Sequence, residues 1–90
     1  MSLKIAVPAS TQSIEDHFVI ERRNTSLICN ASGTPQPTVF WNDVASGQRI
    51  NSSVLEFTNI HRGEAGEYRC EASNECGSAV EEVNVSVLCE

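Results

Sequence analysis

Four residues at fixed spacing constrain the fold of this chain most: Cys29, Trp41, Tyr68 and Cys70. The single tryptophan follows the first of these cysteines at a short interval, and Tyr68 stands two positions before the second. The runs around both cysteines alternate in polarity, which places the two cysteine side chains on inward faces of strands. A sandwich of two stacked sheets around one core accounts for every member of this set.

Alternation with a period of two marks further strands, whereas helical periodicity is weak throughout. The inward-facing residues are predicted to be Leu27, Cys29 and Ala31 in one run, Leu55 and Phe57 in a second, and Val83, Val85 and Val87 in a third. Glycine- and proline-rich segments separate the runs, as in an all-β domain. Asn74–Gly77 is predicted to be a tight hairpin turn in which Gly77 is able to take a positive φ.

Length and charge narrow the possible classes of protein. Ninety residues suffice for one small domain, and 40% hydrophobic residues argue against general disorder. A net charge of −6 disfavours phosphate backbones and anionic lipid, so we expect no nucleic-acid partner and no direct membrane contact. No apolar run approaches the roughly 20 residues that span a bilayer.

The domain is expected to occupy residues 11–90. Residues 1–10 are interpreted as a tag remnant, Met1-Ser2-Leu3, followed by a flexible lead-in or a first edge strand, in which Pro8 restricts pairing. Both ends suggest a fragment cut from a longer protein.

Two longer patterns resemble an immunoglobulin-superfamily domain of the I-set or short C2-set, and the match covers roughly residues 15–88. The family's B-to-C segment is matched by Leu27-x-Cys29-x-Ala31-x-Gly33-x-Pro35-x-Pro37-x-Val39-x-Trp41. Its E-to-G segment is matched by Leu55-x-Phe57-x-x-Ile60 and Glu64-x-Gly66-x-Tyr68-x-Cys70-x-Ala72-x-Asn74-x-x-Gly77, and its last strand by Val85-x-Val87.

The resemblance implies an immunoglobulin-like β-sandwich of two antiparallel sheets with Greek-key topology. It implies a Cys29–Cys70 disulfide between the sheets, which the indole of Trp41 packs against, and a Tyr68 hydroxyl bonded to upstream backbone. Closing that loop is worth about 4 kcal/mol in the chain-entropy model. The expected core is Trp41, Tyr68, Leu27, Leu55, Phe57 and Val85.

Three departures from the family pattern stand out. Glu64 replaces the usual Asp and Arg22 the usual Gly, and neither is expected to threaten the fold. The interval between Cys29 and Cys70 is too short for the extra hairpin of variable-type domains, so an antigen-receptor variable domain is excluded.

Cys76 and Cys89 stand at opposite ends of the last predicted strand. Some nine extended residues between them span roughly 30 Å, whereas a disulfide needs Cα atoms within about 7 Å. The two cysteines therefore cannot pair within one folded domain. Either both are incidental free thiols, or one, with Cys89 the better candidate, bonds to a neighbouring domain or a second chain.

Four of the asparagines begin an N-glycosylation sequon, where chance predicts roughly one: Asn24, Asn30, Asn51 and Asn84. This excess favours the secretory pathway. If all four carry sugar, patches of both sheet faces are shielded, and partners would contact strand edges, loops and domain ends. A partner footprint centred on Asn84 of the glycosylated protein would contradict this hypothesis.

Catalytic and metal chemistry have little support. His17 and His61 are isolated from any nucleophile, and no cysteine pair has zinc-site spacing, so we expect no enzyme, cofactor or metal. Arg62-Gly63-Glu64 is interpreted as a structural corner, Asp43 as a turn carboxylate, and Arg22-Arg23 as a solvated edge rather than as integrin- or glycan-binding groups.

The expected function is non-enzymatic protein recognition, adhesion or spacing in the extracellular part of a multi-domain cell-surface or matrix protein, such as an adhesion molecule or receptor. Its partners would be other proteins and neighbouring domains of the same chain. The alternative is a structural immunoglobulin module of an intracellular filament-associated protein. Glycosylation distinguishes the two.

Overall fold

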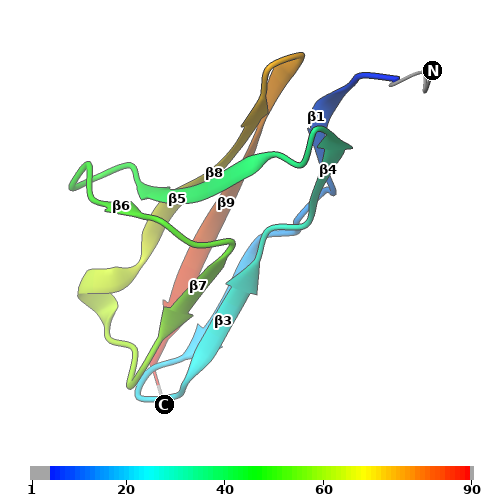
Figure 1. The fold of residues 1–90 in the computed structure, drawn as a ribbon. Helices are drawn as coiled ribbons and strands as arrows, with labels where there is room; N and C mark the ends of the chain where they lie inside the picture. Colours follow the sequence, from blue (N-terminus) through cyan, green and yellow to red (C-terminus); the bar gives the residue numbers. More distant parts are fainter. Residues whose placement is uncertain (1–4, 90) are drawn as a thin grey trace.

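A computed structural model of the chain describes residues 5–89. Strands dominate the described part, with one short 3-10 helix, η1, before the long hairpin (Figure 1). The elements are β1 (Val7–Thr11), β2 (His17–Ile20), β3 (Thr25–Ile28), β4 (Ala31–Thr34), β5 (Thr38–Asp43), β6 (Arg49–Ile50), β7 (Val54–Phe57), η1 (Arg62–Glu64), β8 (Gly66–Asn74) and β9 (Gly77–Leu88).

The strands form two facing layers. One layer is a five-stranded sheet in the order β2-β9-β8-β5-β6, in which β2 runs parallel to β9 and the other pairs are antiparallel. The other layer consists of the antiparallel pairs β1-β4 and β3-β7, and β4 continues the course of β3 (Figure 1). The all-β sandwich expected from the alternating runs is confirmed.

The strand that carries the first cysteine is not continuous, contrary to the prediction for residues 27–31. It divides at Cys29 and Asn30 into β3 and β4. The division has a physical cause: β3 pairs with β7 whereas β4 pairs with β1, so the chain changes neighbours at these two residues. Cys29 nevertheless stays buried, with 3% of its surface exposed.

The segment before residue 11 forms an edge strand, β1, from Val7 onward. Its pairing with β4 shifts register between Val7 and Ser10, around Pro8, which has no N–H to donate. The tag remnant proposed for Met1-Ser2-Leu3 lies outside the described residues.

The core forms around a disulfide between Cys29 and Cys70, as expected, with their Cα atoms 6.4 Å apart. Trp41 is the cross-strand partner of Cys70 and is fully buried. The buried cluster contains every residue predicted for the core, together with others from both layers: Val19, Leu27, Cys29, Trp41, Leu55, Phe57, Ile60, Tyr68, Cys70, Val83 and Val85.

The β8–β9 hairpin turns at Glu75 and Cys76, where a tight turn was predicted. Gly77 does not use the positive φ that glycine allows, since it is not among the residues with that conformation. Asn74 forms the turn instead, because its Oδ1 accepts hydrogen bonds from the backbone N–H groups of Cys76 and Gly77. The space at Gly77 is tight, since a Cβ there would lie 3.1 Å from the Pro8 Cβ, which would have to move slightly.

Candidate recognition surface

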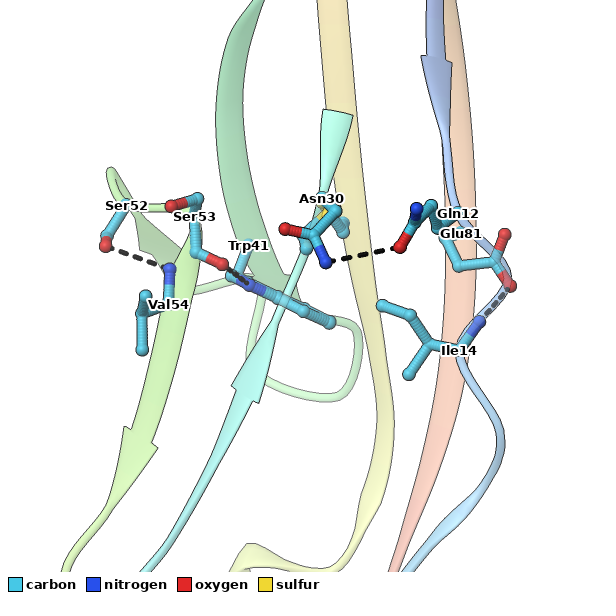
Figure 2. Close-up of a disulfide and its surroundings, with 10 residues drawn as sticks. Gln12, Ile14, Asn30, Trp41, Ser52, Ser53, Val54 and Glu81 are labelled. Carbon is cyan, nitrogen blue, oxygen red and sulfur yellow. Dashed lines mark hydrogen bonds between the residues drawn. A yellow bond between two sulfur atoms is a disulfide. The ribbon is translucent and has the colours of Figure 1, made fainter. Parts of the chain in front are cut away.

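Contacts across the sandwich fix the scaffold that presents its surfaces. The Trp41 indole Nε1 donates a 2.9 Å hydrogen bond to the Ser53 carbonyl, just before β7 (Figure 2). On the other side of the core, the Ile14 N–H donates to Glu81 of β9 at 3.1 Å. The first bond ties the five-stranded sheet to the start of β7 in the opposite layer, whereas the second ties the connection between β1 and β2 to β9.

Tyr68 closes the corner of the sandwich where η1 leads into β8. Its hydroxyl donates to the Glu64 carbonyl at 2.5 Å, and its ring meets Phe57 edge to face, with centroids 5.3 Å apart. Burial, and then the carboxylates of Asp43 and Glu64, raise the pKa of Tyr68 to about 12. Glu64 also accepts from the His61 N–H at η1, so this glutamate shapes the corner through both backbone and side chain.

Arg22 occupies a turn that suits glycine better. Its φ is 69°, in the left-handed region that a β-carbon disfavours. Its N–H donates to the Ile60 carbonyl at 2.6 Å, which holds the turn in place. The strain gives a physical reason for the glycine that the family pattern has here.

The groups considered for catalysis lie apart from one another. His17 bonds the Thr25 hydroxyl at 2.7 Å between the layers, whereas His61 caps η1. Arg62 pairs with Glu21 at 3.5 Å, which gives it a structural partner. Residues 5–89 contain no group of three or more His, Cys, Asp or Glu side chains that could hold a metal ion.

All four sequon asparagines are exposed. Asn84 alternates with buried Val83 and Val85, so it projects from the outer face of the five-stranded sheet. Asn24 precedes β3, Asn30 lies at the β3–β4 break, and both belong to the opposite layer. Asn51 lies between β6 and β7, where its Oδ1 accepts from Arg49 at 3.0 Å.

The outer face of the five-stranded sheet carries a mixed patch that the sequence did not reveal. The Arg49 guanidinium lies over the Phe40 ring, 3.7 Å from its centroid. Glu71 lies between Phe40 and Val80 in the strand register, and Val80 is 48% exposed. Phe40, Arg49, Glu71 and Val80 are called the outer-face patch below. The position of Phe40 next to buried Trp41 predicts an outward side chain, but its stacking on Arg49 depends on the β5–β6 pairing.

Cys76 and Cys89 are free and exposed in the described part of the chain. β9 between them has 12 residues rather than about nine, so it spans about 40 Å at ~3.3 Å per residue. The two thiols therefore lie farther apart than predicted. Separately, no helix among residues 5–89 is long and apolar enough to cross a membrane.

This fold is a two-layer β-sandwich with a disulfide and a tryptophan between the layers, which is the architecture of immunoglobulin-type domains. The family model described as "Immunoglobulin domain" matches residues 5–74. The chain belongs to the immunoglobulin domain family.

Similar sequences occur in proteins of more than one kind. The chain is 37% identical over 86 residues to human IgLON family member 5, and 36% identical over 90 residues to rat limbic system-associated membrane protein. It is also 32% identical over 94 residues to the muscle M-line assembly protein unc-89 of Caenorhabditis elegans. Each match covers 92–94% of the chain. The chain spans only 26% of the IgLON relative and 27% of the limbic one.

The solved structures that resemble this chain also come from proteins of more than one kind. The structure titled Dpr11 IG1 bound to DIP-gamma IG+IG2 superposes with a TM-score of 0.86 at 28% identity, over 93% of this chain and 49% of that one. The titin M10–obscurin-like 1 immunoglobulin complex gives 0.79 at 26% identity, over 93% and 97%. Both are immunoglobulin domains within protein–protein complexes.

Proposed function

We propose that this domain is a non-enzymatic recognition and spacer module in the extracellular part of a cell-surface or secreted protein, and that the outer-face patch contacts its protein partner. The observation that carries the proposal is the exposed Val80 beside the Arg49–Phe40 stack, on a sheet held rigid by the disulfide. Arginine and aromatic side chains are enriched where proteins bind one another. The similarity to limbic system-associated membrane protein supports a role at the cell surface.

Sugar at the sequons is compatible with this choice of surface. Asn84 lies on the same face as Val80, four residues along β9, which is about 13 Å at ~3.3 Å per residue. A partner centred on the outer-face patch would therefore meet a glycan at Asn84 only at its margin. The proposal departs from the sequence-based hypothesis, which expected contacts at strand edges, loops and domain ends, because it places the contact on a sheet face at a distance from Asn84.

A spacer role is supported by a second apolar group. Phe18 is 67% exposed, and Ile20 pairs in register with Leu88, both also exposed. All three lie on β2 and the last residues of β9, on the outward side of the sheet. We place the contact with a neighbouring domain here, because exposed apolar side chains in a cluster mark an interaction surface.

A pair of matched variants tests the recognition surface. Val80→Asp puts a carboxylate into the outer-face patch, whereas Ile28→Asp puts one at a similarly exposed position, 56%, on the opposite layer. With the glycosylated domain fused to an oligomerising tag, binding is measured to itself and to a panel of cell-surface ectodomains. The proposal predicts that a detected interaction is lost with Val80→Asp and kept with Ile28→Asp. The opposite pattern, or no interaction at all, contradicts it.

The second candidate, a structural module of an intracellular filament protein, is favoured by the similarity to unc-89 and to the titin complex. An intracellular module would remain unglycosylated and keep its thiols reduced.

A further inference from the structure

The edge of β7 that faces away from β3 is open. β7 pairs only with β3 among the described residues, and the chain reaches it from β6 of the other sheet through three residues. Within residues 5–89 no strand covers the outer side of β7, and Figure 1 shows β6 and β7 bordering that side. An uncovered edge is a template on which another chain can add a strand.

The register shows which backbone groups are available there. The Cys29 N–H donates to the Ser53 carbonyl at 2.9 Å, so Ser53 and, by alternation, Leu55 and Phe57 direct their backbone groups toward β3. Val54 and Glu56 direct theirs to the open side. The Val54 N–H is satisfied by the Ser52 hydroxyl at 3.0 Å (Figure 2), which leaves the Glu56 N–H and carbonyl as the open pair.

A cleft of about 290 Å³ lies beside this edge. Its apolar lining comes from Ile50, Leu55 and Phe57, and its acidic lining from Asp43, Glu56 and Glu64. A neighbouring hollow of about 310 Å³ also borders Glu56, but it is lined by Asn24 and is therefore the place where sugar on Asn24 would lie. The cleft between β6 and β7 is the better candidate for a peptide.

Two of the three acidic groups at the cleft have no cationic partner among residues 5–89, whereas Glu64 lies 3.4 Å from His61 Nε2. Neither Asp43 nor Glu56 forms an ion pair with a cationic side chain among residues 5–89. The arginines of the adjoining elements β6 and η1 have other partners: Arg49 stacks on Phe40, and Arg62 pairs with Glu21.

The occupant must complement both the open backbone edge of β7 and the negative charge of the cleft. A second copy of this chain fits poorly, because antiparallel pairing of two β7 edges would bring their Glu56 carboxylates together between domains that each carry a net charge of −6. We propose that β7 is a docking edge, at which an extended segment of a partner protein, bearing lysine or arginine, adds a strand through the Glu56 backbone and places cationic side chains at the cleft.

The test uses a defined probe, an amidated seven-residue peptide in which lysine and valine alternate, titrated into the isotope-labelled domain and followed by amide chemical shifts. We expect shifts centred on Glu56, and slowed hydrogen exchange of its N–H. The same peptide with N-methylated backbone amides keeps its charge but cannot pair as a strand, so it should bind at least about tenfold more weakly. Equal binding of the two peptides, or shifts centred on the outer-face patch, overturns the proposal.

Substitutions separate backbone pairing from charge. Glu56→Gln removes the carboxylate and should weaken binding about threefold. Glu56→Pro also removes the outward N–H, which an edge strand tolerates, and should weaken it about tenfold. Glu71→Gln, on the opposite sheet, is the matched charge control and should leave binding unchanged. Equal effects of Glu56→Gln and Glu71→Gln would reduce the interaction to general charge and overturn the proposal. Val80→Asp should not affect this peptide, so failure here is distinct from failure of the proposed function.

Discussion

The Ser53 carbonyl accepts two hydrogen bonds, one from the Trp41 indole and one from the Cys29 N–H, each at 2.9 Å. One donor belongs to the five-stranded sheet and the other to the opposite layer. Ser53 stands immediately before β7, so this shared acceptor positions the strand whose outer edge is open. The same contact links the buried core to the surface that we propose for strand addition.

Replacing Trp41 tests the importance of this contact. Trp41→Phe removes the indole donor and leaves a void beside the disulfide, so we expect the free energy of unfolding to fall by about 3 kcal/mol. Urea unfolding followed by circular dichroism measures the change. A loss below about 1 kcal/mol would mean that the indole is not buried against Cys70 as described.

Arg22 offers a stabilising substitution. Arg22→Gly relieves the positive φ of 69° and should raise the free energy of unfolding by about 0.5 to 1 kcal/mol. Arg23→Gly is the matched control, because Arg23 is not among the positive-φ residues and glycine there adds only unfolded-state entropy. Thermal unfolding of both variants should show shifts of opposite sign. A destabilised Arg22→Gly variant would contradict the turn geometry.

The raised pKa of Tyr68 predicts how the free energy of unfolding depends on pH. Its pKa is raised from 10.0 to about 12, so the folded state favours the neutral phenol. The resulting stabilisation is complete below pH 10, where tyrosine is neutral in both states, and is lost as the pH rises through 12. Because Tyr68 is the chain's single tyrosine, tyrosinate absorbance reports its ionisation directly.

The matched variant for that titration is Tyr68→Phe. It should be less stable at neutral pH, since the bond to the Glu64 carbonyl is lost, and its stability should decline less between pH 10 and 12. Identical alkaline decline in the two proteins would show that Tyr68 does not carry the effect.

The free thiols predict intermolecular rather than intramolecular oxidation. β9 separates Cys76 from Cys89 by about 40 Å, so mild oxidation of the folded domain should produce linked dimers on a non-reducing gel. Cys76→Ser and Cys89→Ser show which thiol links. A monomeric band whose two thiols have become resistant to alkylation would indicate an internal pair and contradict the strand geometry.

Much of the core could be predicted from the sequence because alternation along a strand is local. Leu55 and Phe57, or Val83 and Val85, are inward wherever their strands pair. Other features depend on which strands are neighbours, and the local sequence pattern does not carry that information. They are the break at Cys29 and Asn30, the Arg49–Phe40 stack and the open β7 edge. The sequence could not show which need Gly77 serves, because glycine supplies both a left-handed backbone and the absence of a Cβ, and the close approach of Pro8 points to the second.

The most direct test of the extracellular assignment is a peptide map of the protein from its native source, taken without reduction and after enzymatic release of N-linked glycans. The account predicts a Cys29–Cys70 linked peptide, together with the asparagine-to-aspartate mass change at one or more of Asn24, Asn30, Asn51 and Asn84. Reduced Cys29 and Cys70 with all four asparagines unmodified would contradict the account and favour the intracellular module.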